Sequence, residues 1–147
     1  MRAAVAAAAA LAAAVAVGCG GGDPPALEAA CTDGPEPILR ALARAPGAVR
    51  LADGTRLSDC VAHAFDDGEL QQLGFALTPA ADRLAGRQTA AAALQLGYLI
   101  GAVRRGASRT NGVHAELVRR LEATATGTDA ELVAATRRGI AAGEARG

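Results

Sequence analysis

The chain has 147 residues and no net charge, because fifteen arginines balance fifteen acidic residues and lysine is absent. A neutral chain has no overall attraction to nucleic acid, so we expect no nucleic-acid partner. Aromatic residues at 2% supply almost no platform on which bases or sugars could stack. The core must be built from alanine, leucine and valine, small side chains that bury little area each.

The N-terminus has the plan of an export signal. Arg2 is followed by an uncharged, alanine-rich run over residues 3–17. A positive charge before about 7–15 apolar residues is typical of a signal peptide, whereas a membrane-spanning helix needs about 20 apolar residues. We therefore expect residues 1–18 to be an export signal, with a retained membrane helix as the alternative.

The four residues Ala16-Val17-Gly18-Cys19 resemble the lipobox of bacterial lipoproteins, the motif at which the signal is cut. The resemblance covers only residues 1–19. It implies that Cys19 carries diacylglycerol, with further acyl chains such as palmitate, and becomes the first residue of the mature protein. It also implies a place in the cell envelope, at the outer face of the cytoplasmic membrane, or in the periplasm if the host has two membranes. A non-lipidated signal with a chance cysteine is the alternative.

After the anchor we expect residues 19–30 to form a tether, because Gly20-Gly21-Gly22 gives flexibility and Pro24-Pro25 gives extension. Residues 31–147 then form a single domain.

Two further cysteines, Cys31 and Cys60, remain in that domain. A pair of cysteines in an exported protein favours a disulfide bond, and closing a loop of about 30 residues would stabilise the fold by about 3–4 kcal/mol. The alternatives are two free thiols or a zinc site completed by His63 and His114, although the spacing matches no zinc-finger pattern.

Helical periodicity dominates the domain, and we predict a mainly α fold: a small bundle of five or six helices with one short β-hairpin near residues 49–57. The segments that carry helical signals, short ones included, are 34–45, a short stretch capped by Ser58, 69–77 capped by Asp67, a short stretch opened by Thr78-Pro79, 88–103, 112–125, and 129–142 with a capping box from Thr128. Residues 143–147 are expected to fray.

Two patterns within these elements carry specific expectations. Asp53-Gly54 between alternating apolar residues is a strong hairpin signal, and a three-residue loop would set Leu51 opposite Thr55, with Gly54 left-handed. Gly97 and Gly101 lie four residues apart on the most apolar helix. In a soluble bundle this spacing indicates that a neighbouring helix comes close.

Charge is unevenly distributed along the mature chain. Residues 19–82 hold four arginines and ten acids, giving −6, and residues 83–147 hold ten arginines and five acids, giving +5. The two halves can complement each other within one fold, or the basic half can face anionic lipid or cell-wall polymer. Three arginine pairs are possible anion-binding residues, with ordinary solvated surface as the alternative: Arg104, Arg105, Arg119, Arg120, Arg137 and Arg138.

Catalytic motifs are scarce. His63 has Asp59 four residues before it and Asp67 four residues after it, a spacing that could bind a divalent metal or support acid–base chemistry if the helix continued. A helix-surface ion pair is the alternative. Ser58 and Ser108 lack the turn of a hydrolase nucleophile, and phosphate-binding and zinc-protease motifs are absent. We predict no cofactor and no metal.

The leading hypothesis is a lipid-anchored, non-enzymatic binding or interaction module at the cell envelope, with the membrane, and an envelope protein or anionic polymer, as partners. Two alternatives stay open: an enzyme centred on His63, and a carrier of a small apolar ligand held between the alanine-rich helices.

Overall fold

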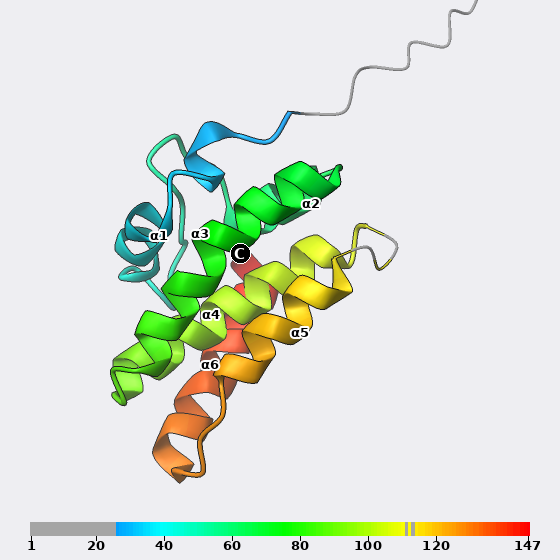
Figure 1. Cartoon of the computed structure of the whole chain (residues 1–147). Coiled ribbons are helices and arrows are strands. Elements are labelled where there is room, and N and C mark those ends of the chain that lie inside the picture. The colour runs from blue at the N-terminus through cyan, green and yellow to red at the C-terminus, as the bar shows by residue number, and fades with distance from the viewer. Residues whose placement is uncertain (1–25, 111, 113) are drawn as a thin grey trace, which may run out of the picture.

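The computed structural model describes residues 26–110, 112 and 114–147; the predicted signal, Cys19 and most of the tether lie outside these residues. The described chain is helical, which confirms the mainly α prediction (Figure 1). A 3-10 turn, η1, is followed by six α-helices: η1 Ala29–Cys31, α1 Pro35–Leu42, α2 Leu57–His63, α3 Asp67–Ala85, α4 Ala90–Ala107, α5 Ala115–Thr124 and α6 Ala130–Arg146.

Helix α4 forms the centre of the bundle and contacts each of the other five helices. Its N-terminus is capped by Thr89, whose side chain accepts a hydrogen bond from the Ala92 N–H. Tyr98, Leu99 and Ile100 are at most 1% exposed, so the helix is apolar around its full circumference, as expected for a central element.

Helices α4 and α6 run in the same direction and make the most extensive helix contact in the described chain. A Cβ atom on Gly97 would lie 2.1 Å from the carbonyl oxygen of Thr136, and one on Gly101 would lie 2.2 Å from that of Ile140. Gly139 and Gly143 of α6 approach the α4 backbone equally closely. The expectation of a near neighbour at Gly97 and Gly101 is confirmed, and glycine is required because no side chain fits between the two backbones.

The C-terminal residues are ordered into α6, so the prediction that residues 143–147 fray is wrong. Arg105 donates from Nη1 to the carbonyl oxygens of Glu144 and Ala145, each at 2.8 Å, and thus stabilises the last turn of α6. Ser58 was expected to cap α2, but its hydroxyl donates to the carbonyl oxygen of Gly147 and the N-cap is Arg56.

The predicted hairpin over residues 49–57 is wrong, since no strand forms in the described chain. Only its turn exists: the Leu51 N–H donates to the Thr55 carbonyl at 2.9 Å, and Gly54 has a φ of +92°. Beyond the turn the flanking groups have other partners. The Val49 N–H donates to the Tyr98 hydroxyl at 3.3 Å, and Leu57 begins α2. An isolated two-stranded ribbon is marginal, and packing against α4 is preferred.

Helix α3 is continuous, so the predicted break at Thr78-Pro79 is wrong. Pro79 lies inside the helix and has no N–H to donate to the carbonyl of Phe75. The helix nevertheless continues, because one face is buried on both sides of Pro79; that face comprises Leu73, Ala76, Leu77, Ala80, Ala81 and Leu84.

The helix caps differ from the expected ones by one residue. Asp66, not Asp67, caps α3 and completes a capping box with Glu69. Asp129, not Thr128, caps α6 by accepting hydrogen bonds from two backbone N–H groups. In α3 the predicted cap Asp67 is preceded by a second aspartate, and in α6 the predicted cap Thr128 is followed by an aspartate. The sequence pattern does not distinguish between such neighbouring candidates.

Candidate functional site

The two cysteines of the domain form a disulfide bond. Cys31 of η1 and Cys60 of α2 are joined with their Cα atoms 5.6 Å apart, as predicted, and both are 1% exposed. Their sulfur atoms are therefore not metal ligands, which rules out the zinc site considered with His63 and His114. The bond attaches the end of the predicted tether to α2.

The candidate catalytic set centred on His63 is not assembled as its spacing suggested. Helix α2 ends at His63, so Asp67 belongs to a different helix and the shared face does not exist. Asp59 accepts hydrogen bonds from Arg56 at 2.8 Å and Arg109 at 3.3 Å. Burial would raise the pKa of Asp59, but its hydrogen bonds and charge contacts with the two arginines outweigh burial and lower it. Asp59 is thus an ion-pair partner rather than a base for His63.

The other histidine is a packing residue. His114 is 2% exposed and its Nε2 lies 2.8 Å from the carbonyl oxygen of Ala64, which joins the start of α5 to the end of α2. The Nδ1 atoms of His114 and His63 are buried without a partner in the described chain. Across that part of the chain no group of three or more His, Cys, Asp or Glu side chains is placed to hold one metal ion.

The first predicted arginine pair, Arg104 and Arg105, is engaged within the molecule. Arg104 pairs with Glu122 at 2.7 Å and Glu144 at 3.3 Å; burial would lower the pKa of Arg104, but the two carboxylates outweigh burial and raise it. Arg105 binds the end of α6, as described above.

The second and third pairs lie on α5 and α6. Arg119 and Arg120 both bind Glu116 at 2.8 Å, and these hydrogen bonds, that of Arg120 first, lower the pKa of Glu116. Arg137 and Arg138 are exposed on α6 and make no hydrogen bond or ion pair to any described residue. The six arginines therefore do not gather into one anion site.

The acidic and basic halves of the chain are joined by two ion pairs. Arg83 binds Glu36 of α1, and Arg109 binds Asp59 of α2. These contacts favour the interpretation that the two halves complement each other within one fold.

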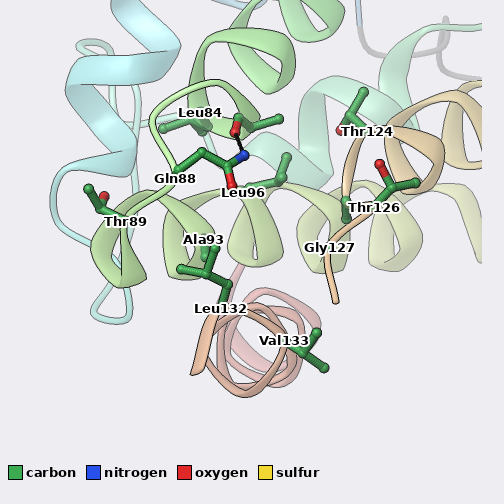
Figure 2. Close-up of a pocket in the computed structure, with 12 residues that line it drawn as sticks. Leu84, Gln88, Thr89, Ala93, Leu96, Thr124, Thr126, Gly127, Leu132 and Val133 are labelled. Atoms are coloured by element: carbon green, nitrogen blue, oxygen red, sulfur yellow. Dashed lines mark hydrogen bonds between the residues drawn. The ribbon is translucent and has the colours of Figure 1, made fainter. Parts of the chain in front are cut away.

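One small cavity lies between the α3–α4 turn and the α5–α6 connection, with Leu132 beneath it (Figure 2). Its volume is about 160 Å³, below the roughly 300–1,000 Å³ of small-molecule sites. Two of the polar groups lining it already have local partners: Gln88 donates to the Ala85 carbonyl at 2.8 Å, and the Thr124 hydroxyl donates to the Leu121 carbonyl at 2.7 Å. The cavity therefore offers little to a ligand.

A larger groove runs between α3 and α5. It has a volume of about 490 Å³, and we call it the α3–α5 groove; it is lined by Asp67, Leu70, Gln71, Gly74, Phe75, Thr78, Pro79, Glu116, Leu117 and Arg120. Its walls combine apolar side chains from both helices with the ion pair between Glu116 and Arg120. Asp67, at the start of α3, is exposed.

One of the two exposed aromatic side chains of the described chain, Phe75, lines the groove. The two phenylalanines of the chain are both exposed, Phe65 by 56% and Phe75 by 70%, and they are the exposed large hydrophobic residues of the described chain. Phe65 precedes the Asp66 cap, at the position that stabilises a helix start by packing near its first turn. Phe75 has no such role, because it lies on the side of α3 opposite the buried Leu73 and Leu77.

Sequence reasoning missed this surface. The helix was expected to break at Thr78, which separated Phe75 from Pro79 and hid the fact that they lie on one continuous helix. A signal was present, because Phe75 falls outside the leucine periodicity of Leu73 and Leu77. A large apolar residue outside the buried stripe of a helix is a reason to look for a contact.

Comparison of the chain with protein-family models, with curated proteins and with solved structures gave no match. No helix in the described part of the chain combines the length and the apolar character that crossing a membrane requires.

Proposed function

We propose that the protein is a lipid-anchored, non-enzymatic interaction module of the bacterial cell envelope, and that the α3–α5 groove is its contact surface. The anchor is the diacylglycerol on Cys19, and the membrane is the partner reached through it. The domain beyond the tether contributes a protein contact rather than a reaction.

The observation that carries the contact surface is the exposure of Phe75 beside the groove. A domain with two phenylalanines and one tyrosine has little aromatic area with which to build its core, yet Phe75 is 70% exposed. Exposed aromatic side chains beside a hollow are typical of protein contacts, where they supply most of the binding energy. Together with the lipobox and the disulfide bond, this surface supports a binding role at the envelope.

The alternatives have less support. The enzyme hypothesis depended on a helix face shared by Asp59, His63 and Asp67, and Asp59 is bound to two arginines. The carrier hypothesis needs an apolar cavity, and a rise in melting temperature with a lipid or terpenoid ligand would be required to favour it.

The anchor is tested by fractionation and intact mass. The membrane-extracted protein should have the mass of residues 19–147 plus acyl groups, two hydrogens lighter before reduction than after it. Cys19→Ser should release the protein from the membrane pellet, while the control variant with Cys31→Ser and Cys60→Ser should stay in the pellet. A wild-type mass without lipid, or one that retains residues 1–18, would overturn the anchor.

The contact surface is tested by photo-crosslinking in cells. A photo-reactive amino acid at Gln71, an exposed residue of the groove, should give one discrete adduct, which the added substitution Phe75→Asp should remove. The same amino acid at Arg137, exposed on α6, should give no such adduct. Equal labelling from both positions would show that the groove is ordinary surface. His63→Ala should leave the adduct unchanged. Loss of the adduct in this variant would show that His63 contributes to the contact.

A further inference from the structure

The α3–α5 groove contains a glycine that the fold of one copy does not explain. Gly74 lies within α3, where glycine costs about 1 kcal/mol relative to alanine. A Cβ atom at Gly74 would meet no atom of the described residues within 4 Å, so neither steric crowding nor a positive φ requires glycine there.

The other helical glycines of this molecule indicate what Gly74 does. Gly97, Gly101, Gly139 and Gly143 each have the backbone of another helix within 2.2 Å of a Cβ position. Gly106 of α4 is similar, with the Ser58 carbonyl oxygen of α2 2.5 Å from its Cβ position. Beyond the first turn of α3, which contains Gly68, the other glycines of the described helix interiors therefore lie where a second helix packs closely. By analogy with these positions, Gly74 marks a crossing by a helix that the described residues of one copy do not supply.

The charges and shape of the groove favour a second copy of the chain as the source of that helix. The rim holds both signs of charge, with Asp67 on α3 and the Glu116–Arg120 pair on α5, so two identical faces do not strongly repel each other. Phe75 projects beside the hollow that Gly74 leaves open. A two-fold axis near Gly74 would place the ring of each copy over the hollow of the other, as a self-complementary interface requires.

A small interface is sufficient if the chains are confined to a membrane. The 12 residues from Cys19 to Cys31 span at most about 40 Å, and the Cys31–Cys60 bond attaches them to α2, directly before α3 in the chain. Anchored copies therefore share a thin layer at the surface, in which the effective concentration is high.

We infer that the protein forms a symmetric homodimer in which α3 of one copy crosses α3 of the other at Gly74, with Phe75 of each copy seated in the α3–α5 groove of its partner. The inference rests on the proposed interaction module and names a second copy as the occupant of its contact surface.

The first test is a disulfide trap in the purified lipoprotein, reconstituted into phosphatidylcholine vesicles. A Gly74→Cys substitution should give a covalent dimer under mild oxidation, because Cα atoms at a two-fold helix crossing lie within the 4.4–6.8 Å that a disulfide needs. The control Arg137→Cys should stay monomeric, and so should the wild type. A dimer from the wild type would instead indicate a free Cys19 thiol and thus a failure of the anchor proposal.

The second test measures the monomer–dimer equilibrium in detergent by sedimentation. Gly74→Leu and Phe75→Asp should weaken the dimer at least tenfold, whereas Phe65→Asp, outside the groove, should leave it unchanged. Gly74→Leu should also melt at or above the wild-type temperature, because leucine has open space there and favours the helix. This result separates loss of the dimer from loss of the fold.

Three results would overturn the homodimer: a Gly74→Cys dimer no more abundant than that of Arg137→Cys, a monomer at every concentration, or a dimer that Gly74→Leu leaves intact. If the purified protein is monomeric while Phe75→Asp still removes the Gln71 adduct in cells, the interaction module stands and its partner is a different protein.

Discussion

The α4–α6 contact and the outer face of α3 use the same residue in opposite surroundings. At Gly97 and Gly101 the backbone of α6 fills the space that a side chain would need, and Tyr98 between them is fully buried. At Gly74 the space is open, and Phe75 beside it is 70% exposed. The α4–α6 contact is a complete interface. The outer face of α3 also has a glycine beside an aromatic residue, but no described segment packs against them.

This difference shows what small residues contribute in a core poor in aromatic side chains. Close approach of two backbones brings many atoms into dispersion contact at once, so α4 and α6 gain stability from proximity rather than from large side chains. An unmatched glycine on α3 therefore indicates a contact made outside the single chain.

The largest expected effect is disruption of the α4–α6 contact. Gly97→Leu should cost more than about 4 kcal/mol of unfolding free energy, because its side chain would have to enter the space held by the backbone of Thr136. Circular dichroism during urea unfolding should show loss of the cooperative transition. Gly74→Leu is the matched control and should unfold cooperatively; a cooperative, wild-type transition for Gly97→Leu would refute the close packing.

The next largest effect is expected from loss of the Cys31–Cys60 disulfide bond. Replacing Cys31 and Cys60 by serine should lower the unfolding free energy by about 3–4 kcal/mol, because the unfolded chain regains the freedom of a loop of about 30 residues. Reduction of the wild-type protein should lower its melting temperature by the same amount as the double substitution. A reductant that leaves the melting temperature unchanged would contradict a stabilising role for the bond.

A smaller effect on the unfolding free energy, of opposite sign, is expected at Gly74. Gly74→Ala should raise the unfolding free energy of the monomer by about 0.5–1 kcal/mol, because alanine loses less backbone entropy in a helix and meets no atom there. Thermal unfolding at a concentration where the protein is monomeric measures this gain. Destabilisation by Gly74→Ala would show that the space over Gly74 is filled within one copy.

The smallest expected effect concerns the ion pairs of Asp59 with Arg56 and Arg109. Burial would raise the pKa of Asp59, but Arg56, and then Arg109 just beyond α4, outweigh burial and lower it. The ion pairs therefore stabilise the folded state above the pKa that Asp59 has in the unfolded chain. That stability is lost as the pH falls below about 4 and the carboxylate is protonated. Asp59→Asn should cost about 0.5–1 kcal/mol at pH 7 and less at about pH 3, because the stabilisation falls as the carboxylate takes up a proton. An equal cost at both pH values would assign the effect to packing instead of charge.

Much of the fold could be predicted from local sequence. Helical periodicity, the near approach at Gly97 and Gly101 and the pairing of Cys31 with Cys60 are confirmed. The hairpin and the break at Pro79 were wrong, because each was decided by partners far along the chain. Val49 bonds to Tyr98, 49 residues away, and the buried face of α3 outweighs the missing hydrogen bond at Pro79.

The candidate site shows the same division. The sequence by itself determined the predicted export signal, the helical class, the cysteine pair and the shortage of catalytic motifs, because these depend on residue types and short spacings. Only the tertiary structure decided that Asp59 is held by arginines, that the space over Gly74 is open, and that Phe75 lies beside a groove. Whether a residue is covered depends on which distant segment packs against it, and the local sequence does not specify that segment.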